Sequence, residues 1–370
     1  MTLERQPCEV STSSTGGMAE YLVMENLLKL GQIDPELSEL LAANPLPTLD
    51  YSTLDDFANV YAKNSERAKR ALGPTPPGVK VTELQYSTRD GHTNRAKLFQ
   101  PEDMPENASP LIVMIHGGGF CFGSPEGEEQ TCRNFVLALG ATCVAIAYRL
   151  APTYPFPYAA NDCWDALKWC AASAQSWNAD TSTGFIVGGS SAGANLAAVL
   201  THRARDEGLL SPLTGQYLAI PLLCPEGKMP EWHRPLWLAR DQNRNAPVLP
   251  TAALNMFLDA YQPNVDDTIN FAIFNHPRGH GDLPPAFFQV DGLDPLRDEA
   301  IIYERVLREE CGVKTRMDVY PGLPHGHWSF FPTLKASAKA RMDQLEGMGW
   351  LLGRTPDFSR VVFGPVAATV

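Results

Sequence analysis

The sequence predicts an α/β fold, in which a mostly parallel central sheet is flanked by helices. Short apolar segments alternate with longer helical segments, and this alternation is typical of a parallel sheet covered on both faces. The chain has 370 residues, of which 44% are apolar and 19% charged. A chain of this length can build one large core or two to three domains. Its composition excludes a disordered or fibrous protein.

The first part of the chain is predicted to be helical. Residues 18–30 are rich in apolar side chains. Asp34 followed by Pro35 indicates an N-cap with proline at the first helical position, and Thr53 with Asp56 resembles a capping box. We therefore expect several helices before the first strand.

From Val79 the apolar pattern changes to a period of two, and the turn at Asp90 and Gly91 predicts a β-hairpin. Further apolar segments predict buried strands at 111–115, 142–147, 184–188, 217–223, 286–290 and 316–320. The helices between them are expected at 130–139, 159–172, 192–207 and 296–310.

The domain organisation follows from where this alternation holds and where it lapses. Between Pro225 and Pro285 the alternation gives way to a stretch rich in Trp, Pro, Asn and Arg, with one predicted helix at 251–261. An insertion of this length between two strands indicates a functional lid. We expect an N-terminal helical segment at 1–78, the two parts of the core at 79–224 and 286–370, and the insertion at 225–285.

Charge and composition narrow the partners and the compartment. With 30 basic and 42 acidic residues the net charge is −12, and this negative field disfavours nucleic acid and anionic membranes. No segment has the length of unbroken apolar sequence that a membrane span needs, and the N-terminus lacks a signal-peptide pattern. The eight cysteines are scattered, so we expect reduced thiols. We therefore expect a cytoplasmic protein.

The segment Gly189-Ser190-Ser191-Ala192-Gly193 matches G-x-S-x-G between a predicted strand and a predicted helix, which is the setting of a nucleophile elbow. Glycines beside a strained serine remove clashes with the adjacent strand and leave the hydroxyl exposed. Ser191 is the predicted nucleophile. The alternative is a glycine-rich turn with a serine N-cap.

The loop that starts at His116 contains three successive glycines after a predicted strand. Such a loop can turn several backbone N–H groups toward one point, as the stabilisation of an oxyanion requires. We assign these donors to Gly118, Gly119 and Ala192. A flexible loop or a phosphate cradle are the alternatives, and the phosphate-binding glycine motifs are absent from the sequence here.

A serine nucleophile needs a histidine base and a carboxylate that orients it. Asp294 and His325 each follow a predicted strand, and the order Ser191, Asp294, His325 is that of α/β-hydrolases. Alternatives exist for both positions: Asp298 as a helix N-cap, Asp291 as a loop acceptor, and His327 in place of His325.

Together these motifs resemble the hormone-sensitive-lipase-like family of α/β-hydrolases. The resemblance rests on HGGGF at 116–120, YRLAP at 148–152, FP at 156–157, GSSAG at 189–193, DPLRDE at 294–299 and HG at 325–326. It implies Ser191 as nucleophile, His325 as general base and Asp294 as its orienter. It further implies an oxyanion hole of Gly118, Gly119 and Ala192, and a helical cap built from the N-terminal segment and the insertion.

Some positions depart from the usual family pattern. Ser190 stands where an acidic residue is common, and His327 and Trp328 stand where apolar residues are common. Ser190 and His327 flank predicted catalytic residues and so bear on pocket polarity. We expect His327, Trp328 and Phe120 to contact the substrate.

The leading hypothesis is hydrolysis of a small or medium hydrophobic carboxylic ester through an acyl-enzyme, without a cofactor or metal. The second is acyl transfer, cyclisation or dehydration on the same site, because the scaffold is also similar to plant dehydratases. The third is a receptor-like module similar to the gibberellin receptor, in which the catalytic histidine is lost. A metal site from His276, His280, His325 and His327 is disfavoured, since Pro277 and Gly279 spoil a helical pair. A homodimer is common among similar proteins.

Overall fold

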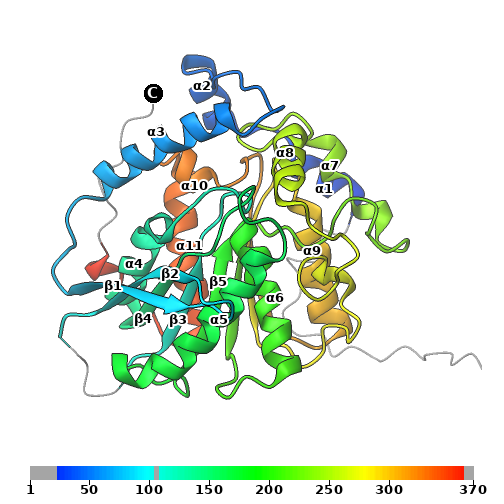
Figure 1. Cartoon of the computed structure of the whole chain (residues 1–370). Helices are drawn as coiled ribbons and strands as arrows, with labels where there is room; N and C mark the ends of the chain where they lie inside the picture. The colour runs from blue at the N-terminus through cyan, green and yellow to red at the C-terminus, as the bar shows by residue number, and fades with distance from the viewer. Residues whose placement is uncertain (1–22, 104–107, 362–370) are drawn as a thin grey trace, which may run out of the picture.

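A computed structural model describes residues 23–103 and 108–361. Eight strands form one sheet in the order β1-β2-β4-β3-β5-β6-β7-β8 (Figure 1). Only β2 is antiparallel to its neighbours, β1 and β4. The predicted α/β fold with a mostly parallel sheet is confirmed. The strands are β1 (Val79–Ser87), β2 (Thr93–Pro101), β3 (Leu111–Ile115), β4 (Thr142–Ile146), β5 (Phe185–Ser190), β6 (Gly215–Ala219), β7 (Ala286–Asp291) and β8 (Thr315–Tyr320).

Helices cover both faces of the sheet. One hydrophobic cluster joins the sheet to α5, α6 and α9, and a second joins its other face to α4 and α11. The central strand β3 is buried along its whole length, as expected for a parallel strand between two helical layers. The helices are α1 (Met24–Leu30), α2 (Pro35–Ala43), α3 (Asp55–Leu72), α4 (Glu129–Leu139), α5 (Tyr158–Ser173), α6 (Ala192–Glu207), α7 (Ala239–Gln242), α8 (Thr251–Tyr261), α9 (Arg297–Arg305), α10 (His327–Phe330) and α11 (Lys335–Leu352).

The two predicted helix starts near the N-terminus have different outcomes. Asp34 caps α2 as predicted, because its side chain accepts the N–H of Leu37 at 3.0 Å. The predicted capping box at Thr53 is wrong. Its hydroxyl accepts the N–H of Asp55, two residues on, and the carboxylate of Asp56 binds the N–H of Asp50 instead. Of the helix expected at 18–30, residues 18–22 lie outside the described residues, and α1 begins at Met24.

Two other predicted elements end earlier than expected. The strand expected at 217–223 is β6, which ends at Ala219 because Ile220 takes a left-handed backbone conformation with φ of 45°. The helix expected at 296–310 ends as α9 at Arg305 and continues as a π-helical turn over Val306–Glu310. The remaining predicted strands and helices agree with the structure to within two residues.

The N-terminal helices attach to the same end of the sheet as the insertion (Figure 1). Leu30 of α1 is buried, and its carbonyl accepts the N–H of Gly322 at 2.7 Å, in the loop after β8. The side chain of Gln242 at the end of α7 donates to the carbonyl of Leu28. In contrast, α3 spans 18 residues and buries none of them.

The described residues contain no helix that is long and apolar enough to cross a membrane. The seven described cysteines, from Cys121 to Cys311, are free thiols, and Cys8 lies outside the described residues. Burial raises the pKa of Cys121 to about 12. The six buried thiols therefore behave as small apolar side chains of the core, and Cys311 is half-buried.

Candidate active site

The serine loop is a tight strand-to-helix turn between β5 and α6. Ser191 has a left-handed backbone with φ of 56°, and its N–H donates to the carbonyl of Ala219 at 2.8 Å. A Cβ atom on Gly189 or Gly193 would lie 2.5 or 2.1 Å from the carbonyl oxygen of Ile115. Both flanking positions therefore require glycine, which is the physical reason for the motif.

Ser191, His325 and Asp294 form one chain of hydrogen bonds. The distance from His325 Nε2 to Ser191 Oγ is 2.8 Å, and that from His325 Nδ1 to Asp294 Oδ2 is 2.6 Å. The other oxygen of Asp294 accepts the N–H of Leu296 at 2.9 Å. This arrangement can move a proton from the serine hydroxyl to the imidazole while the carboxylate holds the ring. The structure thus brings together the three residues that the sequence singled out.

The alternative acids and the alternative histidine lie in other contacts. Asp298 caps no helix of its own, because it lies inside α9 and accepts the N–H groups of Leu238 and Ala239, both at 2.6 Å. Asp291 binds His327, with 2.9 Å between the ring Nδ1 and the carboxylate. His325 is therefore the histidine that reaches the serine.

The backbone N–H groups assigned to an oxyanion hole are free to bind an anion. Gly118 and Gly119 have φ of 116° and 59°, and a Cβ on Gly118 would lie 2.3 Å from the carbonyl oxygen of Phe122. No N–H of Gly118, Gly119 or Ala192 donates to an acceptor within the described residues. Ala192 is also the first residue of α6, where N–H groups lack an intrahelical partner. An oxyanion hole at these atoms stays a prediction.

His116, at the start of the glycine loop, is a buried neutral ring. It stacks on Tyr148 with ring centroids 4.3 Å apart, and Tyr148 donates its hydroxyl hydrogen to the His116 carbonyl at 3.0 Å. Burial lowers the pKa of His116 to about 4. The imidazole is therefore uncharged at neutral pH and supports the loop by packing.

A buried acid lies under the serine loop, and the sequence analysis missed it. The side chain of Glu128 hydrogen-bonds to Ser190, the residue directly before Ser191. Glu128 is 7% exposed, and burial raises its pKa to about 7. An acidic side chain is thus present beside the serine loop after all, but it is Glu128, reaching across from the segment before α4. No local pattern marks this contact, because 62 residues separate the partners.

The three residues predicted to contact substrate have different surroundings. Phe120 is 1% exposed and stacks on Tyr261, with ring centroids 4.0 Å apart. His327 is fully buried against Asp291, and Trp328 packs partly buried on the cluster that α4 and α11 share. These positions do not support a direct substrate contact for Phe120 or His327.

Aromatic side chains from three segments meet beside the glycine loop. Phe57 from α3 lies 5.3 Å from Phe122 and 4.9 Å from Phe257 of α8, measured between ring centroids, and Tyr61 lies 5.4 Å from Phe122. A Cβ on Gly119 would fall 2.4 Å from the Phe257 ring. This group of four side chains, the aromatic cluster, places an apolar wall next to the glycine loop.

The insertion is bound to the core by buried carboxylates. Asp298 binds the start of α7, and Glu299 accepts the N–H groups of Leu223 and Cys224 at 2.6 and 2.5 Å. Glu299 also pairs with Arg240 of α7 at 2.8 Å. The DPLRDE motif therefore positions Asp294 and fastens the insertion directly behind it. The sequence analysis quoted this motif without assigning that second role.

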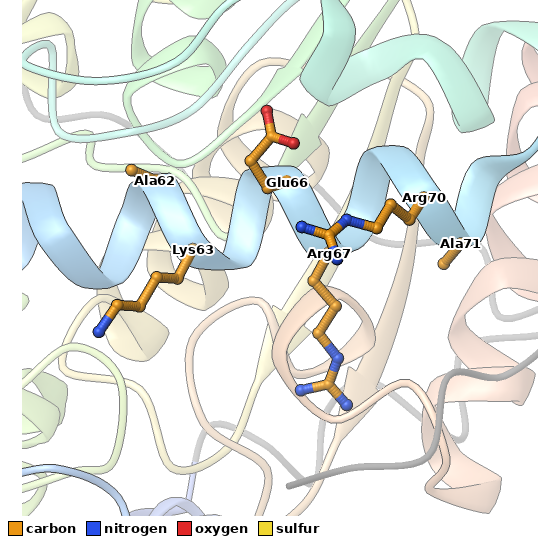
Figure 2. A pocket seen from close by; sticks show the side chains of 6 residues that line it. All are labelled: Ala62, Lys63, Glu66, Arg67, Arg70 and Ala71. Carbon is orange, nitrogen blue, oxygen red and sulfur yellow. The ribbon is translucent and has the colours of Figure 1, made fainter.

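A hollow of about 750 Å³ lies along α3 and includes none of the three hydrogen-bonded residues. Figure 2 shows its lining side chains projecting from this one helix: Ala62, Lys63, Glu66, Arg67, Arg70 and Ala71. The hollow is therefore a feature of the helix that buries no residue and is separate from the serine loop.

The histidines considered for a metal site lie in two separate places. His276 and His280 pack around His202, and a ring nitrogen of His280 lies 2.9 Å from one of His202. His325 lies in the loop after β8, and His327 is the first residue of α10. The described residues contain no group of three or more His, Cys, Asp or Glu side chains arranged to hold a metal ion.

Comparison with known proteins places this fold in a class. A family model for the alpha/beta hydrolase fold matches residues 112–329, which is more than half of the chain. The chain therefore belongs to the α/β-hydrolase family.

Its relatives place it in the hormone-sensitive-lipase-like esterase group, as the motifs predict. It is 34% identical to the AB hydrolase superfamily protein B1A11.02 of Schizosaccharomyces pombe, over 88% of this chain and 95% of that protein. It is 31% identical to the esterase LipI of Mycobacterium tuberculosis, over 83% of this chain and 92% of the relative. The crystal structure of vibralactone cyclase matches with a TM-score of 0.83 and 31% identity, over 89% and 97% of the two chains.

Proposed function

We propose that this protein is a serine carboxylesterase that cleaves small or medium hydrophobic esters. The observation that carries the proposal is the hydrogen-bonded chain from Ser191 through His325 to Asp294, with distances of 2.8 and 2.6 Å. This connectivity is that of the Ser-His-Asp triad of serine hydrolases. Membership of an esterase group supports the same reaction.

The proposed reaction uses only groups of this chain and water. His325 takes the Ser191 proton while the oxygen attacks the ester carbonyl, and the N–H groups of Gly118, Gly119 and Ala192 bind the oxyanion. His325 then gives the proton to the leaving alcohol, which leaves an acyl-enzyme. A water molecule, deprotonated by His325, attacks the acyl group and releases the acid, and the proton returns to Ser191.

The substrate class follows from the cap and the aromatic cluster. We propose that the described part of segment 1–78, residues 23–78, and the segment 225–285 together form this cap. Residues 1–22 lie outside the described residues. Phe57 comes from the first segment and Phe257 from the second, and they meet 4.9 Å apart beside the glycine loop. Aromatic walls of this kind favour an apolar acyl or alcohol group of limited size.

The test is hydrolysis of soluble chromogenic esters from two to twelve carbons by the intact protein, Ser191→Ala and His325→Ala. Each triad variant should lose about 10⁴-fold or more in kcat. Ser329→Ala, which changes an exposed serine, is the matched control and should retain full activity. Equal activity of intact protein and Ser191→Ala would overturn the proposal.

The second candidate is acyl transfer within one substrate molecule, which closes a lactone. The observation that favours it is the similarity to vibralactone cyclase over 89% of this chain. The acyl-enzyme step is shared, but an internal hydroxyl of the substrate replaces water. We extend this candidate to a role in specialised metabolism. Labelling of Ser191 by a fluorophosphonate without cleavage of any ester in the series would favour transfer over hydrolysis.

The receptor-like alternative is the weakest, because the similar receptor lacks the catalytic histidine, whereas here His325 is hydrogen-bonded to Ser191. Absence of both ester cleavage and fluorophosphonate labelling would support it. The homodimer and the cytoplasmic location expected from the sequence stay predictions. Light scattering of the purified chain measures the first.

A further inference from the structure

A second buried Asp–His pair lies beside the proposed triad. His327 Nδ1 is 2.9 Å from Asp291 Oδ1, and neither side chain is exposed. Asp291 is the last residue of β7, three positions before Asp294, and His327 comes two positions after His325. The second pair therefore flanks the two loops that carry Asp294 and His325. The proposed mechanism leaves the second pair without a role.

Asp291 also holds the main chain next to the catalytic histidine. Its Oδ2 accepts the N–H of Gly326 at 2.8 Å. Gly326 directly follows His325 and has a left-handed backbone with φ of 67°. One carboxylate thus ties the end of β7 to two successive residues of the His325 loop. Any shift of this carboxylate would move the backbone that carries the proposed base.

The hydrogen bonds define the charge of the pair. Both oxygens of Asp291 accept from N–H donors, so a proton on either oxygen would displace one of these bonds. His327 Nε2 has no hydrogen-bond partner among the described residues, and a buried N–H without a partner would cost more than a buried lone pair. A neutral His327 and an ionised Asp291 satisfy these contacts. The pair then carries one negative charge.

The ionisable groups around this charge come from every neighbouring element. Burial raises the pKa of Asp291, and His327 opposes this effect. Asp294 and His325 interact with it from the adjacent loops. The remaining groups are Tyr217 on β6, Tyr320 on β8 with its ring 5.1 Å from that of His327, and Arg297 of α9, which bonds to the carbonyl of Gly292 at 3.1 Å. From α11, Ser337 bonds to the His327 carbonyl, Asp343 accepts the hydroxyl hydrogen of Tyr320 and pairs with Lys339, and Arg341 donates to the Trp328 carbonyl.

We propose that Asp291 is a positioning residue for the reaction at Ser191, and that His327 holds the Asp291 carboxylate in place by a hydrogen bond. Its carboxylate fixes the backbone beside His325, and its charge stabilises the imidazolium that forms when His325 takes the serine proton. The inference rests on the proposed function, because it requires His325 to act as the base. Partners that orient metal-ligating histidines typically change activity by about 10- to 100-fold, and we expect an effect at the lower end of that range at this Asp–His pair.

The test compares pH profiles of kcat/KM for the intact protein, Asp291→Asn, His327→Phe and His327→Gln. Asparagine keeps an oxygen for Gly326 but removes the charge. Less stabilisation of protonated His325 should move the acid limb to lower pH by about 0.5 to 1 unit and reduce the plateau about tenfold. His327→Phe should act in the same direction, because Asp291 loses its donor and takes up a proton. His327→Gln keeps an N–H donor and should retain the profile of the intact protein.

The rate of Ser191 labelling by a fluorophosphonate, followed over the same pH range, serves as a second readout that needs no ester. If Asp291→Asn does not fold, the contrast between His327→Phe and His327→Gln decides. A plateau loss with an unmoved acid limb in both would reduce the pair to a structural role and overturn the proposal. Failure of the proposed hydrolysis is distinguishable, since the intact protein would then cleave no ester of the series, whether or not Ser191 is labelled.

Discussion

The serine loop and helix α3 represent opposite ways of building one site. In α6, which follows Ser191, twelve of 16 residues are buried, and its first turn lies against backbone atoms of β3. In α3 none of 18 residues is buried, and contacts with the rest of the site go through Phe57 and Tyr61. Where backbone packs on backbone, a position accepts one residue type. Where a helix contacts its neighbours through only a few side chains, most of its positions tolerate substitution.

The largest effect expected from this contrast is at Gly189. In Gly189→Ala the new Cβ would lie 2.5 Å from the Ile115 carbonyl oxygen and 2.6 Å from the Gly193 carbonyl carbon, and neither backbone atom can yield cheaply. We expect a loss of more than about 3 kcal/mol in the free energy of unfolding, measured by urea denaturation. The matched control is Gly281→Ala in the insertion, where the new Cβ meets nothing within 4 Å. Equal stability of the two variants would refute the contrast.

The second effect is a pH dependence at Glu128 below the serine loop. Its pKa is raised from 4.5 to about 7 in the folded protein, so the folded state binds the proton more tightly than the unfolded state. This stabilisation is complete below pH 4.5 and is lost as the pH rises through about 7, by up to about 3 kcal/mol. Glu128→Gln should therefore be more stable than the intact protein at pH 8, and the difference should shrink at pH 5.

Urea unfolding at both pH values measures this difference. Glu126→Gln, two positions away, is the control, because the Glu126 carboxylate is 39% exposed and pairs with Arg95. It should show no gain of stability at pH 8. A parallel pH response of Glu128→Gln and the intact protein would contradict the assignment of a buried acid.

The third effect couples the glycine loop to the aromatic cluster. Gly119→Ala should reduce kcat/KM by about 10- to 100-fold, because the new Cβ would lie 2.4 Å from the Phe257 ring and φ is left-handed. Phe257→Ala removes that ring, so in this background Gly119→Ala should reduce kcat/KM by a several-fold smaller factor. The double-mutant cycle on ester hydrolysis measures this coupling. Additive losses would show that backbone strain alone is responsible.

The smallest effect is expected in α3. Phe57→Ala removes ring contacts with Phe122 and Phe257 from a half-buried position, so we expect about 1 kcal/mol or less in stability. Because these rings belong to the aromatic cluster of the proposed cap, KM for the apolar esters should rise several-fold while kcat stays close to that of the intact protein. Asn59→Ala, exposed on the same helix, should change neither. A fall in kcat without a change in KM would place Phe57 in another role.

Features with a local sequence signal could be predicted, whereas contacts between residues far apart in the chain could not. The strand at 111–115 and the three loops with Ser191, Asp294 and His325 carry local signals: apolar runs, glycine spacing and chain order. The contacts of Glu128 with Ser190, and of Asp298 with Leu238, join residues about 60 positions apart. A carboxylate that caps a distant segment has the same local pattern as a solvated one. Even the local signal at Thr53 failed, because Asp50 competed for the carboxylate of Asp56.

The exposure of α3 also determines how often this helix opens compared with the sheet. Amide hydrogens exchange with solvent through openings whose free energy depends on how much burial each opening disrupts. Opening α3 breaks contacts of two rings, whereas opening β5 requires the sheet to separate. Deuterium should therefore enter the α3 amides long before those of β5. The α3 side of the aromatic cluster therefore opens and closes many times while the serine loop stays folded.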